Sequence, residues 1–202
     1  MSSASPQPVL KLARSELILG GQKSGKSRRA ETLARNWLDQ SPGRRALLIA
    51  TARPGDQEMR LRIARHQADR AARLPGMLTL EEPLALAETL VRHSRADTLV
   101  VVDCLTLWLT NWMLPMPPEA AQNPARAAFN GEQVAMLLEA IAVAPGPVVL
   151  VGNEIGLGVI PLGREVRAFV DALGQLNQDV ARVCQRVTLM AAGLPLTLKD
   201  AV

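Results

Sequence analysis

The sequence is poor in aromatic side chains: its 202 residues include three Trp, two Phe and no Tyr. A core built from such a chain is aliphatic, and proteins that stack unpaired bases on aromatic platforms are disfavoured. The formal net charge is +4, with much of the excess between residues 14 and 73, but no dense basic run typical of a nucleic-acid arm occurs. That excess is either a solvated surface or a field that attracts polyanionic nucleotides. We therefore expect no nucleic-acid partner.

Cysteine is also scarce, with only Cys104 and Cys184, each inside an apolar run. Two cysteines in such surroundings predict buried thiols rather than a disulfide framework. The first eight residues lack the charged and apolar regions of a signal peptide, and no apolar run approaches the ~20 residues that span a bilayer. These absences predict a cytoplasmic protein that is not an integral membrane protein.

The pattern of the chain predicts a flexible leader over residues 1–14 and a single P-loop nucleotide-binding domain over residues 15–202. Short apolar runs alternate with helical periodicity, which predicts an α/β three-layer P-loop NTPase fold with a mostly parallel central sheet. Four prolines predict a loop over residues 115–124. The expected strands are 15–19, 45–50, 77–80, 98–102, 148–151, 187–191 and 194–198, and the expected helices are 26–40, 56–73, 84–93, 105–114, 132–143 and 164–183.

A phosphate-binding loop, GGQKSGKS, follows the first expected strand at residues 20–27. Glycines let backbone N–H groups point at phosphates, Lys26 can reach the β- and γ-phosphates, and the Ser27 hydroxyl can hold Mg²⁺. The amphipathic helix that follows also favours anions at its N-terminus. The spacing predicts a nucleoside triphosphate site made of Gly20, Gly21, Gln22, Lys23, Ser24, Gly25, Lys26 and Ser27.

Asp103 ends the apolar run TLVVV. A carboxylate that ends so apolar a strand is costly unless it has a cation or hydrogen bonds. We interpret Asp103 as the second Mg²⁺ ligand of the P-loop, with Ser27 as the first. The alternative is a cap for the helix that follows, and one carboxylate can serve both roles.

The chain contains two histidines, His66 and His93. His93 ends a predicted helix, where an imidazolium complements the helix dipole, so we assign it a structural role. His66 lies mid-helix between Arg62 and Arg70, four residues away on either side and on the same face. Neighbouring cations disfavour its protonation, which leaves a neutral nucleophile, and they could also hold a triphosphate. An inert surface histidine is the alternative.

Over residues 16–199 the sequence resembles the bifunctional adenosylcobinamide kinase / adenosylcobinamide-phosphate guanylyltransferase family of cobalamin biosynthesis. The resemblance implies a transferase that phosphorylates adenosylcobinamide with ATP or GTP and then transfers GMP from GTP to the product. The small-molecule partner would be this corrinoid or its phosphate. The matching segments are GGQKSGKS (20–27), ATARPGDQEM (50–59), RIARHQADR (62–70), DCLTLWLTN (103–111), VLVGNEIGLGVIP (149–161) and REVRAFVDALGQLNQ (164–178).

The resemblance also implies roles for particular residues. His66 matches the histidine that carries GMP as a covalent intermediate, and Lys26 is the other catalytic residue. Glu81 matches an acidic nucleotide contact; its alternative is the first turn of the next helix. Asn153 and Glu154 follow a strand, where open α/β sheets place ligands, and form either the active-site wall or a structural turn. The implied site adds Ala50, Thr51, Ala52, Gln67, Ala68, Asp69, Arg70, Glu81 and Asp103.

A homotrimer is implied as well, with the substrate site near a subunit boundary. The expected helix at 105–114 carries Trp108 and Trp112, which suit either a subunit contact or the core. Two rival functions stay open from the sequence. One is a P-loop small-molecule kinase without guanylyl transfer, and the other is a nucleotide-binding regulatory protein.

Overall fold

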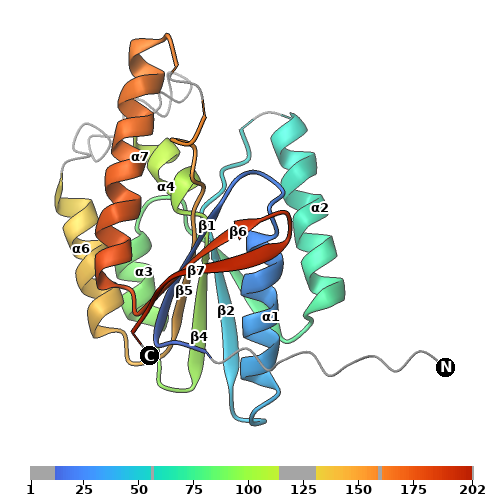
Figure 1. Cartoon of the computed structure of the whole chain (residues 1–202). Coiled ribbons are helices and arrows are strands. Elements are labelled where there is room, and N and C mark those ends of the chain that lie inside the picture. Colours follow the sequence, from blue (N-terminus) through green and yellow to red (C-terminus); the bar gives the residue numbers. More distant parts are fainter. Residues whose placement is uncertain (1–11, 56, 114–130, 159–160, 202) are drawn as a thin grey trace.

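The computed structural model describes residues 12–55, 57–113, 131–158 and 161–201, apart from the side chains of residues 59, 62 and 66. Its centre is a seven-stranded sheet with the order β3-β2-β4-β5-β1-β6-β7 (Figure 1). All neighbouring pairs are parallel except β6 and β7, which form an antiparallel hairpin at one edge. The strands are β1 (Ser15–Gly20), β2 (Arg45–Ala50), β3 (Met77–Glu81), β4 (Thr98–Asp103), β5 (Val148–Val151), β6 (Arg186–Ala191) and β7 (Leu194–Asp200).

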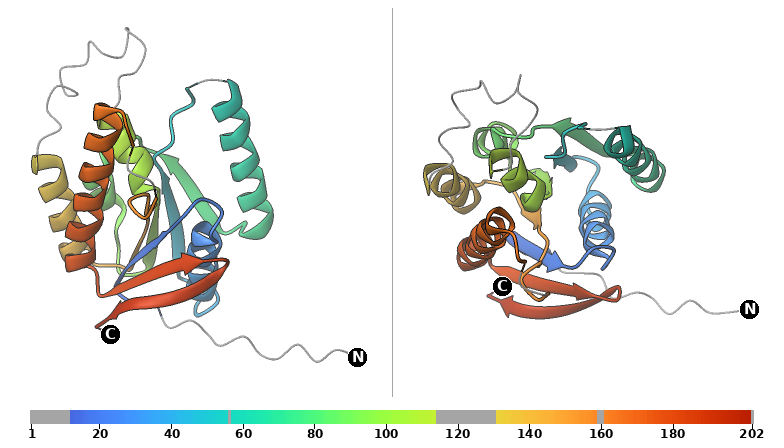
Figure 2. Two further views of the ribbon diagram at one scale, coloured as in Figure 1. Left: turned by 45° about the horizontal axis from the view of Figure 1, so that its top comes forward. Right: turned by 90° about the horizontal axis from the view of Figure 1, so that it is seen from above.

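Helices cover both faces of the sheet and make three layers. Seen along the sheet in Figure 2, α1 and α2 lie on one side, and the remaining helices lie on the other. The described helices are α1 (Lys26–Leu38), α2 (Gln57–Arg73), α3 (Leu86–His93), α4 (Leu105–Met113), α6 (Gly131–Val143) and α7 (Arg164–Val183). This confirms the α/β three-layer fold with a mostly parallel sheet.

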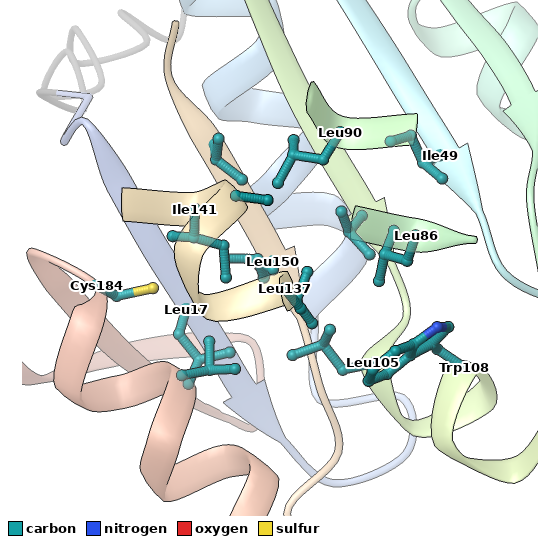
Figure 3. Close-up of a cluster of buried hydrophobic side chains, with 14 of the residues drawn as sticks. Leu17, Ile49, Leu86, Leu90, Leu105, Trp108, Leu137, Ile141, Leu150 and Cys184 are labelled. Carbon is teal, nitrogen blue, oxygen red and sulfur yellow. The ribbon is translucent and has the colours of Figure 1, made fainter. Parts of the chain in front are cut away.

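The central strands are continuous apolar runs because both of their faces are covered. On one face, Leu17, Val102 and Leu150 pack against α3, α4, α6 and α7 in the larger core cluster. Figure 3 shows Leu86, Leu105 and Trp108 converging in this cluster. On the other face, Ile18 and Leu48 pack against α1. The two cores explain why these strands read as unbroken apolar segments.

The predicted element boundaries agree with the structure to within a few residues, including the edge strands β3 and β7. The proposed leader ends too late, because Ala13 is buried and the Arg14 side chain donates hydrogen bonds to the carbonyls of Ala142 and Ala144. The rest of that leader before residue 12 and the proline-rich loop at 115–124 lie outside the described residues. Within the described part of the chain, no helix combines the length and apolarity needed to cross a membrane.

One buried feature of the first strand was not predicted. Glu16 is fully buried, and its Oε1 accepts hydrogen bonds from Arg29 Nε of α1 and from Thr188 Oγ1 of β6, each at 2.8 Å. A buried carboxylate needs such partners. They fix the start of α1, and therefore the phosphate loop, relative to the sheet.

Candidate active site

Residues predicted to bind nucleotide from distant parts of the chain fall in one row across the sheet. Ala50 of β2 is the register partner of Glu81 in β3 and of Asp103 in β4. The row continues from Asp103 to Val151 of β5 and on to Ile18 of β1, two residues before the phosphate loop begins. The carboxyl ends of parallel strands meet at one edge, which is where open α/β sheets bind ligands. The fold thus gathers the loop, Ala50, Glu81 and Asp103 at a single edge.

The backbone of the phosphate loop needs glycine at two positions. Gly20 has φ of 151° and Gly25 has φ of 103°, conformations that other residues rarely adopt. A Cβ on Gly20 would lie 2.5 Å from the Met190 carbonyl oxygen and 2.6 Å from Ser24 Oγ. The tip of the β6–β7 hairpin supports the loop from outside, because Gly193 N–H donates to the Ser24 carbonyl at 3.0 Å. The loop is held by the sheet as well as by its own sequence.

Lys26, the first residue of α1, lies folded back across the loop. Its Nζ donates hydrogen bonds to the carbonyls of Gly20 at 2.9 Å and Gly21 at 2.6 Å. Burial lowers the pKa of the Lys26 ammonium, while Cys104 and Asp103 oppose that shift. These hydrogen bonds place the ammonium at the mouth of the loop, where phosphate oxygens can replace carbonyl oxygens as its partners.

The predicted metal ligands lie together. Ser27 Oγ donates a 3.2 Å hydrogen bond to Asp103 Oδ2, so one hydroxyl and one carboxylate face the same point. These hard oxygen donors suit Mg²⁺, which takes one or two protein ligands and completes its shell with water and phosphate. No cluster of three His, Cys, Asp or Glu side chains occurs among the described residues. The donor set fits Mg²⁺.

Cys104, not Asp103, is the residue immediately before α4, and its carbonyl accepts the Trp108 amide. Its thiol is a buried core group whose pKa is raised to about 12 by burial. Both cysteines are free and buried, as predicted.

Thr51 contributes to the site indirectly. It is fully buried, its hydroxyl donates to the Cys104 carbonyl at 2.7 Å, and the same hydroxyl accepts the Cys104 amide at 2.9 Å. Its own carbonyl accepts a bond from Asn111 Nδ2. These bonds tie the end of β2 to the end of β4 and occupy the polar groups of Thr51. Ala50 and Ala52 on either side are partly exposed.

The other predicted group lies along α2 and β3. Gln67 Nε2 donates to Glu81 Oε1 at 2.8 Å, and Arg70 contacts Thr79 Oγ1 at 3.5 Å, while Ala68 and Asp69 are exposed. Glu81 ends β3, so its alternative assignment to the first turn of the next helix is wrong. Glu82 accepts the amides of Leu84 and Ala85 just before α3, and the acidic residue in the first turn of α3 is Glu88.

His66 belongs to α2 and directly precedes Gln67, but its side chain and that of Arg62 lie outside the described residues. Their expected common face with Arg70 stays a prediction.

A pocket of about 400 Å³ opens beside the phosphate loop. Glu154, which follows β5, lines it together with the tip of the loop. The remaining wall comes from the end of β6 and from Leu157. Its lining residues are Gly21, Gln22, Lys23, Ser24, Glu154, Leu157, Leu189, Met190, Ala191 and Ala192.

The tryptophan helix is a core element rather than an exposed one. Trp108 is 1 % exposed and its Nε1 donates to the Leu84 carbonyl at 2.9 Å. Trp112 is partly buried against the same cluster. Of the two alternatives for this helix, core packing is correct for Trp108.

The sheet order, the loop and the paired Ser27 and Asp103 define a P-loop nucleoside-triphosphate-binding protein. Solved structures share this fold at 11 % sequence identity. A flagellar accessory protein, FlaH, from Methanocaldococcus jannaschii matches with a TM-score of 0.50 over 94 % of this chain and 80 % of that chain. A protein of Pyrococcus horikoshii OT3 matches with a TM-score of 0.51 over 96 % and 90 %. These likenesses concern the fold alone.

Sequence comparison identifies the family. The family model described as cobinamide kinase / cobinamide phosphate guanyltransferase matches residues 16–198. The chain is 50 % identical over 184 residues to the bifunctional adenosylcobalamin biosynthesis protein CobP of Pseudomonas aeruginosa, covering 91 % of this chain and 96 % of that protein. It is 32 % identical over 188 residues to CobU of Salmonella typhimurium, with 91 % and 98 % covered. The chain belongs to the cobinamide kinase / cobinamide phosphate guanyltransferase family, whose members are bifunctional enzymes of cobalamin biosynthesis.

Proposed function

We propose that this protein phosphorylates the hydroxyl of the aminopropanol arm of adenosylcobinamide and then transfers GMP from GTP to the new phosphate. The products are adenosylcobinamide phosphate and adenosyl-GDP-cobinamide. The observation that carries the proposal is the row of Glu81, Ala50 and Asp103 at the sheet edge that also bears the phosphate loop. Both reactions need a bound triphosphate, and we assign its site to this edge.

In the kinase step, the loop amides and Lys26 bind the β- and γ-phosphates of ATP or GTP. The substrate hydroxyl attacks the γ-phosphorus, and the bond to the bridging oxygen breaks to release the nucleoside diphosphate. Catalysis of such transfers is largely positioning and neutralisation of charge. Lys26 supports this role because its ammonium already bonds two loop carbonyls at the mouth of the loop.

Ser27 and Asp103 would hold Mg²⁺, as their 3.2 Å contact allows. When bound, the ion neutralises charge on the phosphate oxygens. Asp103 also orients the Ser27 hydroxyl, so its carboxylate contributes to the order of this end of the loop.

In the second step, a neutral His66 attacks the α-phosphorus of GTP, a P–N bond forms, and pyrophosphate leaves. A phosphate oxygen of adenosylcobinamide phosphate then attacks the same phosphorus and releases His66. A covalent intermediate divides one difficult displacement into two easier ones. The support is positional: His66 directly precedes Gln67, which donates a hydrogen bond to Glu81 in the row that Glu81 forms with Ala50 and Asp103.

The test is to incubate the purified protein with GTP labelled at the α-phosphate. We expect a protein-bound label that is labile to acid, stable to alkali, released on addition of cobinamide phosphate, and absent from a His66→Ala variant. GTP labelled at the γ-phosphate should leave no label on the protein. A protein that phosphorylates cobinamide but never takes the α-label is a kinase without guanylyl transfer, and the second reaction is then wrong.

The proposed assembly is a homotrimer with the substrate site near a subunit boundary. Light scattering after size exclusion should then give three times the chain mass of 21.8 kDa. Because both reactions consume nucleoside triphosphates, we also propose that the enzyme works in the cytoplasm.

A further inference from the structure

Glu154 lies between the two parts of the predicted kinase site. It follows β5, the strand inserted between β1, which leads to the phosphate loop, and β4, which ends at Asp103. The Glu154 amide donates to the Gly20 carbonyl at 3.3 Å. The same carbonyl accepts a hydrogen bond from Lys26 Nζ. The backbone of Glu154 is therefore attached to the loop at the point where Lys26 binds.

The carboxylate of Glu154 keeps most of its capacity to accept protons or hydrogen bonds. Among the described residues, Oε1 accepts one long bond from the Gly156 amide at 3.3 Å, and Oε2 accepts one from Asn177 Nδ2 at 3.4 Å. Within the described part of the chain, no Lys, Arg or His nitrogen lies within 4.0 Å of it. The side chain is half-buried and lines the same pocket as the tip of the loop. Long, imperfect bonds before substrate arrives are common for catalytic acids and bases.

A hydrogen bond from Asn177 of α7 orients this carboxylate. Asn177 is 4 % exposed, and its Nδ2 also donates to the Asn153 carbonyl at 3.0 Å. Gly152 lets this happen, because a Cβ there would lie 3.3 Å from Asn177 Oδ1 and 3.1 Å from the Leu19 side chain. A buried amide aimed at the turn thus holds both the backbone of Asn153 and the side chain of Glu154.

We propose that Glu154 is the general base of the kinase step and that Asn177 is its positioning residue. The inference rests on the proposed phosphorylation of the cobinamide hydroxyl. Glu154 takes the hydroxyl proton while the substrate oxygen bonds to the γ-phosphorus and the bond to the β,γ-bridging oxygen breaks. The proton ends on the carboxylate and the electron pair of the broken bond stays with the nucleoside diphosphate. Protein kinases place a carboxylate at the attacking hydroxyl for the same purpose.

The guanylyl step does not need Glu154 as a general base. Its final nucleophile is a phosphate monoester, whose second pKa is about 6, so an ionised oxygen is already present at neutral pH. Its first nucleophile is a neutral imidazole, which has no proton to lose from the attacking nitrogen. A base is therefore needed by one of the two reactions only.

The experiment uses the full-length enzyme and compares Glu154→Gln, Glu154→Asp and the control Glu139→Gln, an exposed carboxylate on α6. Cobinamide phosphorylation and GMP transfer to cobinamide phosphate are measured separately. Glu154→Gln should lower the kinase kcat by about a hundredfold or more, within the usual contribution of a general base. The KM for ATP and the rate of GMP transfer should change less than about threefold. Glu154→Asp should retain intermediate kinase activity, and Glu139→Gln should match the wild type.

A pH profile separates a base from a structural residue. The acid limb of the wild-type kinase kcat should be absent from the residual activity of Glu154→Gln. Asn177→Ala should lower the kinase kcat by about tenfold without raising the KM for ATP and should leave GMP transfer intact.

Two results would overturn the proposed role of Glu154 and leave the proposed kinase reaction standing. In one, Glu154→Gln retains more than about a tenth of the wild-type kinase kcat, and in the other it loses both reactions equally. A raised KM for ATP at unchanged kcat would make it a nucleotide contact instead. A wild-type enzyme that makes no cobinamide phosphate would overturn the proposed kinase reaction itself.

Discussion

The helices α1 and α2 are consecutive in the chain and cover the same side of the sheet (Figure 2). Different kinds of contact nevertheless hold them in place. Six residues of α1 are buried, among them Leu33 and Trp37 in the core. None of the described side chains of α2 is buried, and Leu61 is 66 % exposed. The helix that opens the phosphate site is thus part of the core, whereas the helix that carries His66 rests on the surface.

Polar contacts attach α2 to its neighbours. Arg73 pairs with Glu31 of α1 at 2.9 Å, and this hydrogen bond is the main reason why the pKa of Arg73 is raised. Gln67 binds Glu81. Exposed polar pairs contribute about 0–1 kcal/mol each, far less than buried apolar contacts. The phosphate site is thus the rigid half of this pair, and α2, which has few buried apolar contacts, is the half that opens locally at lower cost.

The largest expected effect comes from Lys26→Ala, which acts on the rigid half and should impair both reactions. The ammonium neutralises phosphate charge in each transition state, so we expect a loss of about a thousandfold in kcat/KM for both. Separate assays of cobinamide phosphorylation and GMP transfer check this. Retention of a tenth of the kinase turnover would show that the loop is not the phosphate site.

His66→Ala acts on the other half and should affect one reaction. GMP transfer should fall to background because the nucleophile is gone, while the kinase rate should stay within about tenfold of wild type. His93→Ala, at the end of α3, is the control and should cost about 1 kcal/mol or less of stability. Loss of both reactions in a folded His66 variant would mean that α2 also belongs to the kinase site.

Asp103→Asn keeps the shape of the side chain and removes its charge. We expect the Mg²⁺ concentration for half-maximal kinase activity to rise by about tenfold, because a neutral amide is the weaker ligand. A Mg²⁺ titration of both enzymes measures it. An unchanged requirement combined with a lower melting temperature would make Asp103 a structural residue that orients Ser27 rather than a metal ligand.

A matched pair of leucines tests the packing difference directly. Leu33→Ala in α1 removes a fully buried side chain and should lower the free energy of unfolding by about 2–5 kcal/mol. Leu61→Ala in α2 removes an exposed one and should change it by less than about 0.5 kcal/mol. Urea unfolding of the two variants gives both numbers, and similar losses would contradict the comparison.

The smallest effect is expected for Gln67→Ala, which removes the contact to Glu81. Its effect on unfolding should stay below about 1 kcal/mol because Glu81 is exposed and regains water. The KM for GTP in GMP transfer should nevertheless rise by about threefold to tenfold, with the kinase step unchanged. An unchanged KM in both reactions would remove Gln67 from the nucleotide site.

Much of this architecture could be predicted because its signals are local. The glycines, Lys26 and Ser27 form a contiguous motif, and each central strand is an apolar run of its own. Glu154 was predicted only as part of an active-site wall, since its hydrogen bonds to the loop and to Asn177 join segments far apart in the chain. Glu16 could have been noticed as a lone carboxylate within the apolar run SELILG. The sequence around Glu16 does not indicate its partners Arg29 and Thr188, which lie in α1 and β6.

By itself, the sequence determined the elements, the phosphate loop and the family, because periodicity and contiguous motifs are properties of short segments. Only the tertiary structure decided the strand order, which aligns Glu81, Ala50 and Asp103 in one row and inserts β5 between the loop and Asp103. It also decided that Trp108 is core and that Thr51 serves as a brace. Strand order depends on how apolar faces from the whole chain are buried together, and a run such as VVLV is equally apolar wherever the sheet places it.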